Sequence, residues 1–175
     1  PVAKVLNDKF GIDKGFLTAI HAYTNSQKLQ DLGAKDLRDA RAAAQNIVPS
    51  PTGAAKAVGL VIPELKGRFT GVSFRVPTPT VSVVDFTAIL NKEASAEEIR
   101  SAMLEYANGP MKGILDVTDE PLVSTDMRGT HFSSVFSALD TIVLGNMIKV
   151  VAWYDNEWGY ACRTADLTAI IAKSL

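Results

Sequence analysis

The sequence predicts an α+β domain with a largely antiparallel or mixed sheet and helices packed on one face. Strand-like segments clearly outnumber the helical segments that could connect parallel strands. No Gly-x-Gly-x-x-Gly follows a strand, and there is no Walker loop. Hydrophobic residues make up 47% of the 175 residues and charged residues 21%, which is typical of one globular domain with a sizeable core.

The composition also argues against several classes of protein. The net charge of -1 is not that of a general nucleic-acid binder. We expect no membrane association, because no apolar run reaches the roughly 18–20 residues that span a bilayer and no signal peptide is visible. Cys162 is the only cysteine, which excludes an intrachain disulfide and a cysteine zinc cluster, and no metal site is predicted. These features suit a cytoplasmic protein.

Residues 1–10 predict a helix that begins at the first residue of the chain, without a capping residue before it. Pro1 is favourable in a first turn, where its missing N–H has no cost, and Gly11 provides a stop signal. Apolar residues repeat at helical spacing: Val2, Val5 and Leu6. No residue is available as an N-cap, so the chain looks cut at the start of this helix, and we expect an important segment upstream.

Residues 12–23 predict an apolar strand that delivers His21 into a polar loop. Ile20 and Ala22 face one side of the strand and His21 faces the other. Hydroxyl and amide side chains follow: Tyr23, Thr24, Asn25, Ser26 and Gln27. An imidazole that titrates near neutrality beside such groups suits acid–base chemistry, although a structural histidine at a strand end has the same pattern.

A long irregular segment runs from Asn25 to Pro51, and a loop of this length is usually functional or covered by a partner. Thr52 then predicts the N-cap of a helix that continues through Val58 and ends near Pro63. Free N–H groups at a helix start also attract phosphate, so capping and anion binding both remain open for this position.

Residues 69–90 predict two strands, interrupted at Pro77-Thr78-Pro79. Arg75 lies on a face of the first strand with apolar neighbours. A cation in such a place requires an anion, and the sequence leaves open whether that anion is a carboxylate of the protein or a ligand.

The second half of the chain begins with a helix from Ser95 to about Asn108, opened by a capping box. Residues 113–132 predict short strands and turns, and residues 133–144 predict a strand pair or one bent strand. After a turn, residues 147–154 predict another apolar strand.

Asp155 and Asn156 together predict the cap of a last helix, residues 157–173. From spacing alone, capping is the favoured role of Asn156.

Cys162 has no nearby base in the sequence and is predicted to be a buried, inert thiol. His131 is predicted to lie in a surface loop.

Five blocks of residues, in order and covering nearly the whole chain, resemble the C-terminal catalytic domain of phosphorylating glyceraldehyde-3-phosphate dehydrogenase. The blocks are His21-Ala22-Tyr23-Thr24 with Gln27, then 41–47 (RAAAQNI), 52–58 (TGAAKAV), 75–79 (RVPTP) with 81–85 (VSVVD), and 153–160 (WYDNEWGY). Five ordered blocks are far more specific than any one motif.

The resemblance implies the oxidation and phosphorylation of an aldehyde. A cysteine thiolate attacks the aldehyde, hydride passes to NAD, and inorganic phosphate cleaves the resulting thioester. In the family the cysteine lies in a Ser-Cys-Thr-Thr-Asn block before the helix that resembles residues 1–10. That block and the N-terminal Rossmann domain are absent from this chain. Residues 1–175 therefore resemble the catalytic domain alone, and we expect the isolated chain not to turn over.

The resemblance also implies roles for individual residues. His21 resembles the acid/base residue. Thr24 and Arg75 match residues that bind the phosphate of the substrate, Thr52 and Gly53 match the site for inorganic phosphate, Asn156 matches the residue that orients the nicotinamide carboxamide, and Tyr160 lies nearby. These assignments make Arg75, Thr52 and Asn156 functional as well as structural candidates.

The implied partners are glyceraldehyde 3-phosphate, inorganic phosphate and NAD, in a glycolytic homotetramer in which residues 23–47 reach toward a neighbouring subunit's cofactor. Leu32 favours NAD over NADP, and Gly33 leaves the choice open. The family often has serine where this chain has Pro51. Two alternatives remain: an erythrose-4-phosphate dehydrogenase, which the run Ala22-Tyr23-Thr24 fits less well, and a non-catalytic module for phosphate binding or oligomerisation.

Overall fold

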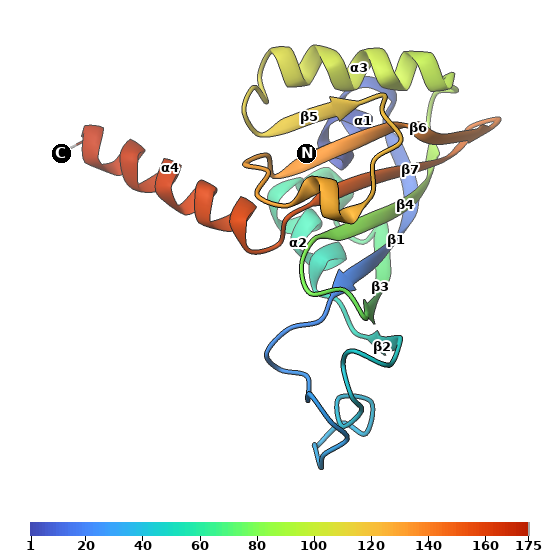
Figure 1. Cartoon of the computed structure of the whole chain (residues 1–175). Coiled ribbons are helices and arrows are strands. Elements are labelled where there is room, and N and C mark those ends of the chain that lie inside the picture. Colours follow the sequence, from blue (N-terminus) through green and yellow to red (C-terminus); the bar gives the residue numbers. More distant parts are fainter. Residues whose placement is uncertain (175) are drawn as a thin grey trace.

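A single twisted sheet of seven strands organises the protein (Figure 1). The computed structural model describes residues 1–174. The strand order is β2-β3-β1-β4-β7-β6-β5. The β1–β3 and β5–β6 pairs are parallel and the other neighbouring pairs are antiparallel, so the predicted mixed sheet is confirmed. The strands are β1 (Ile12–Ala22), β2 (Val48–Ser50), β3 (Phe69–Val76), β4 (Ser82–Leu90), β5 (Leu115–Thr118), β6 (Ser134–Leu144) and β7 (Met147–Tyr154).

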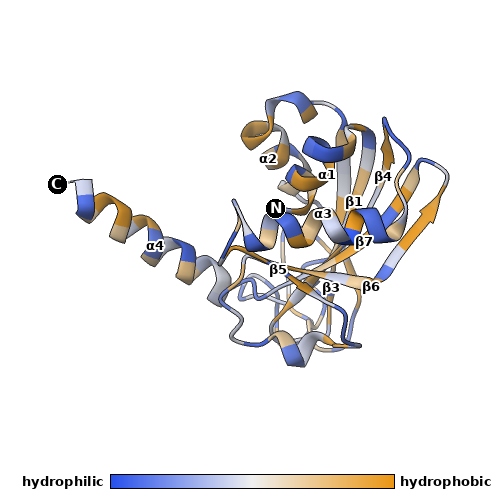
Figure 2. Ribbon diagram, turned by 90° about the horizontal axis from the view of Figure 1, so that it is seen from above, coloured by the Kyte–Doolittle hydropathy of each residue, from blue (hydrophilic) through white to orange (hydrophobic). Residues whose placement is uncertain are grey.

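Three of the four α-helices pack on one face of this sheet, and the last extends away from it (Figures 1 and 2). The helices are α1 (Val2–Phe10), α2 (Ala54–Val61), α3 (Ala96–Asn108) and α4 (Trp158–Ser174), with the 3-10 turns η1 (Pro63–Leu65) and η2 (Ser124–Met127). None of the helices in residues 1–174 has the length and apolar composition needed to cross a membrane.

The main core lies between the sheet and the helices α1 and α3. It includes Leu6 from α1, Met103 from α3, and Phe86, Phe136 and Ile148 from the strands, each 4% exposed or less. Alternate residues of the strands face this core, so the period-two pattern of the sequence fixes which side of the sheet the helices cover.

The N-terminus of α3 forms as the sequence predicts. The Ser95 hydroxyl accepts a hydrogen bond from the backbone N–H of Glu98, and the Glu98 carboxylate accepts one from the backbone N–H of Ser95. This capping box satisfies two backbone donors that would otherwise lack partners.

The structure corrects three local expectations. The N-cap of α2 is Gly53 and not Thr52, whose hydroxyl instead accepts a hydrogen bond from Ala54 N at 3.1 Å. The short strand β2 is an addition, because three residues that include Pro49 give no alternation to detect. Cys162 is partly exposed rather than buried, because α4 stands away from the core.

The bent-strand alternative for residues 133–144 is the one that forms. β6 is continuous, but its pairing with β7 shifts register between Ser137 and Ile142. Of the segment 25–51 that was expected to be irregular, residues 25–47 are irregular, with an isolated bridge between Lys28 and Ala42, and residues 48–50 form β2.

Candidate active site

His21 and Arg75 meet where the parallel strands β1 and β3 end, because they are paired in the register of the two strands. Arg75 Nη1 lies 2.5 Å from His21 Nδ1 and donates to the carbonyl oxygen of Ala22 at 3.1 Å. Within residues 1–174 no carboxylate forms an ion pair with Arg75. The sequence left open whether the anion beside Arg75 is a carboxylate of the protein or a ligand. No carboxylate in the described residues fills this role, which leaves the ligand.

His21 Nδ1 has two competing neighbours, and the tautomer decides which one it engages. Nδ1 lies 2.6 Å from the carbonyl oxygen of Ala22, to which a protonated nitrogen donates. An unprotonated Nδ1 accepts from Arg75 instead, since a guanidinium has only donors. In either form, Nε2 has no hydrogen-bond partner in the described part of the chain, so it is the nitrogen open to proton exchange.

The surroundings of His21 favour the neutral imidazole. Burial lowers the pKa of His21 below its usual value, and the positive charge of Arg75 acts in the same direction. The hydrogen bond to Ala22 and the negative charge of Glu157 offset part of this effect. A histidine that stays neutral near pH 7 can accept a proton, which is the requirement for a general base.

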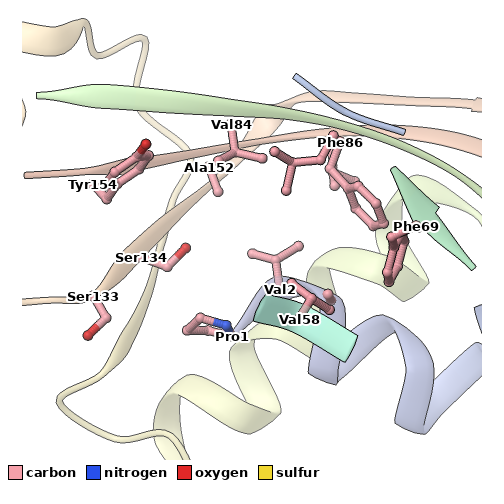
Figure 3. A pocket seen from close by; sticks show the side chains of 13 residues that line it. Pro1, Val2, Val58, Phe69, Val84, Phe86, Ser133, Ser134, Ala152 and Tyr154 are labelled. Carbon is pink, nitrogen blue, oxygen red and sulfur yellow. The ribbon is translucent and has the colours of Figure 1, made fainter. Parts of the chain in front are cut away.

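Tyr154, the last residue of β7, lies next to His21. Its ring contacts the His21 ring edge-on, with the centroids 6.1 Å apart. Burial raises the pKa of the Tyr154 phenol, and the positive charge of Arg75 offsets part of that rise. Tyr154 also lines an apolar cavity of about 190 Å³, where Val84 faces Val2 and Val58 from the helices (Figure 3). The group formed by His21, Arg75 and Tyr154 therefore lies next to this apolar cavity.

Asn156 follows β7 and is held in place by the residue before it. Asp155 is 6% exposed and caps α4, since one carboxylate oxygen accepts from Glu157 N at 3.2 Å and Trp158 N at 3.0 Å. The other oxygen accepts from Gly129 N at 3.0 Å. The expectation that Asn156 shares the capping is wrong, because a single aspartate satisfies the helix start and leaves the asparagine side chain available.

Thr24 lies at the start of the irregular loop. Its backbone N–H donates to the side-chain oxygen of Gln27 at 3.2 Å, and its hydroxyl lies 3.0 Å from that of Ser26. Thr24 and Gln27 line a cavity of about 330 Å³ together with Glu157. The loop thus comes close to the segment that carries Asn156.

The other three predicted site residues are not joined to this group by hydrogen bonds in the described chain. Thr52 and Gly53 lie at the start of α2, and Gly53 is exposed with no neighbour within 4 Å of a Cβ built there. Tyr160 is in the first turn of α4 and is 76% exposed. Each is accessible to a ligand.

One residue of this site escaped the sequence reasoning. Ser82 belongs to a matched block but received no role. It is 2% exposed and donates to Asn156 Oδ1 at 3.3 Å. A signal was present: Ser82 continues the inward face formed by Val84, Phe86 and Ala88, and a buried hydroxyl on an apolar face needs partners.

Comparison with known proteins identifies the family. Residues 1–156 match the family described as "Glyceraldehyde 3-phosphate dehydrogenase, C-terminal domain", and the chain belongs to it. The resemblance of the five blocks is thereby confirmed.

Several curated relatives align with nearly the whole chain. The chain is 58% identical over 174 residues to "Glyceraldehyde-3-phosphate dehydrogenase 1" of Bacillus subtilis, covering 99% of this chain and 52% of that protein. It is 60% identical over 175 residues to "Glyceraldehyde-3-phosphate dehydrogenase" of Mycolicibacterium smegmatis, covering 100% and 52%. It is 57% identical over 174 residues to the chloroplastic "Glyceraldehyde-3-phosphate dehydrogenase A" of Chlamydomonas reinhardtii, covering 99% and 46%. The chain thus spans about half the length of these relatives.

Proposed function

We propose that this chain is the catalytic domain of an NAD-dependent, phosphorylating glyceraldehyde-3-phosphate dehydrogenase. The observation that carries the proposal is the His21–Arg75 pair, a largely neutral imidazole beside a cation that has no protein anion within residues 1–174. A phosphorylated aldehyde needs both groups, a base near the reacting carbon and a cation for the phosphate. The identity of 58–60% to proteins named for this activity supports the same choice.

In the proposed reaction, His21 moves protons at the reacting carbon. Its Nε2 takes the proton of the attacking cysteine thiol and returns it to the aldehyde oxygen as the C–S bond forms, which gives the hemithioacetal and a neutral imidazole again. The thiol would lie in the half of the protein outside this chain. The hemithioacetal hydroxyl then gives its proton to Nε2 as the carbon is oxidised to a thioester. NAD, when bound, accepts the hydride that leaves that carbon. Burial, and to a smaller extent the charge of Arg75, lowers the pKa of His21 and so favours the neutral imidazole between transfers.

The proposed anion sites lie around this base. Arg75 and Thr24 bind the phosphate of the substrate, since a guanidinium and a hydroxyl both donate hydrogen bonds to phosphate oxygens. Thr52 and Gly53 bind inorganic phosphate at the start of α2, where backbone N–H groups and the helix dipole favour an anion. The exposure of Gly53 leaves room for the ion.

Asn156 is suited to hold the nicotinamide carboxamide. Its oxygen already accepts from Ser82, and its NH₂ group has no partner among the described residues. An amide side chain with free donors is complementary to a carboxamide oxygen. Tyr160, about one turn further along, is exposed beside the same proposed site. The dinucleotide itself would be bound mainly by the other half of the protein.

The test compares histidine variants in the whole protein. We expect aldehyde- and phosphate-dependent NADH formation, with kcat reduced by roughly 10²–10⁴-fold in His21→Asn, the usual contribution of a general base. His131→Asn is the matched control, because that histidine is exposed in a loop. The 175-residue chain alone should form no NADH. NADH formation by the chain alone, or equal rates in the two variants, contradicts the proposal.

Substrate profiling tests the choice of aldehyde. We expect a higher kcat/KM for glyceraldehyde 3-phosphate than for erythrose 4-phosphate, and the reverse order would identify the alternative dehydrogenase. Anion binding without any oxidation by the whole protein would favour the non-catalytic module. Light scattering should give a tetramer in the full-length protein, which we propose to be cytoplasmic and glycolytic.

A further inference from the structure

We propose that Ser82 is a positioning residue that couples the orientation of His21 to that of Asn156. The catalytic consequence rests on the proposed function, whereas the coupling itself is a property of this chain. Ser82 is the first residue of β4, which lies between β1 and β7 in the sheet. Its hydroxyl is therefore placed between the end of one strand and the end of the other.

A single buried hydroxyl joins the two site residues. Ser82 Oγ accepts a hydrogen bond from the backbone N–H of Ala22 at 3.1 Å. The same oxygen carries the proton that is donated to Asn156 Oδ1 at 3.3 Å. A serine hydroxyl has one donor and two acceptor positions, so both bonds can form together. Alanine or valine at this position could form neither.

The first bond fixes the peptide that orients His21. The pairing of β1 with β4 ends at Ile20 and Val83, so Ala22 lies beyond the ladder and its N–H takes the Ser82 side chain as acceptor. The carbonyl oxygen of Ala22 lies within hydrogen-bond distance of both Arg75 and His21 Nδ1. Ser82 thus holds one end of the residue whose other end contacts the imidazole and the guanidinium.

The second bond fixes which end of the Asn156 amide faces outward. Because Ser82 donates to Oδ1, that oxygen points into the protein and the NH₂ group is left for a ligand. Without the Ser82 hydroxyl, no hydrogen bond from the described residues would hold Asn156 Oδ1 toward the protein. The amide could then take both orientations, and its NH₂ group would face a ligand only part of the time. A shift of Ser82 therefore alters the base and the carboxamide-binding group together.

The chain offers a matched control for a merely structural serine. Ser73 is also buried in a strand, at 5% exposure, and its hydroxyl donates to the carbonyl oxygen of Ala19 at 3.1 Å. It contacts neither His21 nor Asn156 in the described structure. Ser73→Ala therefore removes a buried hydroxyl and its hydrogen bond without touching the proposed coupling.

The first experiment measures the coupling in the 175-residue chain, with no substrate or cofactor. NMR spectra with ¹⁵N labelling report the Asn156 side-chain amide and the His21 ring nitrogens through a pH titration. We expect Ser82→Ala to shift both sets of signals and the His21 titration midpoint, and Ser82→Thr to restore them toward the original values. Ser73→Ala should leave both sets unchanged. Should Ser82→Ala fail to fold, Ser82→Cys, which keeps the volume and weakens both hydrogen bonds, takes its place.

The second experiment measures the consequence in the whole protein. We expect Ser82→Ala to lower kcat/KM by on the order of 10- to 100-fold, because small displacements of reacting groups have effects of this size. The KM for NAD should rise and the acidic limb of the pH–rate profile should move, whereas Ser73→Ala should change neither.

The outcomes separate the inference from the proposed function. Identical behaviour of Ser82→Ala and Ser73→Ala in both experiments overturns the coupling, even where His21→Asn abolishes activity. Shifted NMR signals in the 175-residue chain, together with a whole protein that oxidises no aldehyde, confirm the coupling and contradict the proposed function.

Discussion

Apolar residues repeat at helical spacing in both α3 and α4, but only α3 is packed against the sheet. α3 buries Ile99, Ala102 and Met103, two of them completely. In α4 the corresponding apolar side chains are exposed: Leu167 at 57%, Ile170 at 64% and Ile171 at 52%. Figure 2 shows hydrophobic residues along α4 at a distance from the rest of the chain.

The difference between α3 and α4 shows that apolar packing stabilises one helix, whereas polar contacts position the segment of the other that carries a site residue. Most helical stability in proteins comes from packing an apolar face, and α3 has that packing while α4 has it only at Gly159. The base of α4 is nevertheless fixed by polar contacts, from Asp155 to Gly129 and from Arg163 to the carbonyl oxygen of Gly113 at 3.1 Å. Asn156 lies in this anchored base, so its position does not depend on the exposed part of the helix.

The largest predicted effect comes from truncating the packed face. Met103→Ala should lower the free energy of unfolding by about 2–5 kcal/mol, because it removes a fully buried side chain and leaves a cavity. Ile170→Ala should change it by no more than about 0.5 kcal/mol, as for other exposed positions. Urea unfolding of the 175-residue chain measures both. Comparable losses in the two variants would show that α4 is packed in solution.

A smaller effect is expected at the anchored base of α4. Asp155→Ala removes the acceptor of three backbone N–H groups and should lower the free energy of unfolding by about 1–3 kcal/mol. Hydrogen exchange should accelerate at Gly129 and Trp158 in this variant and stay unchanged in α3. Asp155→Asn, which keeps one side-chain acceptor, should lose less. Unaltered exchange at Gly129 and Trp158 would exclude the anchoring role.

The contrast between α3 and α4 also shows which features of a helix can be predicted from the sequence and which cannot. Both helices were predicted close to their observed bounds, because caps and apolar spacing are local signals. The capping box at Ser95 was predicted completely for the same reason. The exposure of Cys162 was not, since whether a helix face is covered depends on what lies against it and not on its own pattern.

In the candidate site, too, features with a local signal were predicted and features that depend on distant residues were not. His21 and Arg75 were singled out by their positions on predicted strands and by resemblance, and their pairing follows from the parallel register of β1 and β3. The partners of Ser82 could not be predicted, because they are 60 residues before it and 74 residues after it in the chain. A long-range hydrogen bond leaves only an indirect trace, here a hydroxyl on an otherwise apolar strand face.

The smallest predicted effect concerns the capping box of α3 and depends on pH. Hydrogen bonds from the backbone and side chain of Ser95 lower the pKa of Glu98 below its usual value. The folded state therefore holds the charged carboxylate more firmly than the unfolded chain does, and this contribution is complete above the usual glutamate pKa of about 4.3. It is lost as the pH falls through the lowered folded value. Solvent screens the exposed group, so the effect should be smaller than that of Asp155→Ala.

The variant Glu98→Gln isolates this contribution, because glutamine can still accept from Ser95 N but does not titrate. Urea midpoints measured from pH 6 to pH 3 should fall less steeply in Glu98→Gln than in the unmodified chain. Glu97→Gln is the control, since Glu97 is exposed in the same turn and lies outside the capping box. Equal slopes in Glu98→Gln and the unmodified chain would mean that the charge of Glu98 adds nothing to the stability of α3 beyond the hydrogen bonds that glutamine also forms.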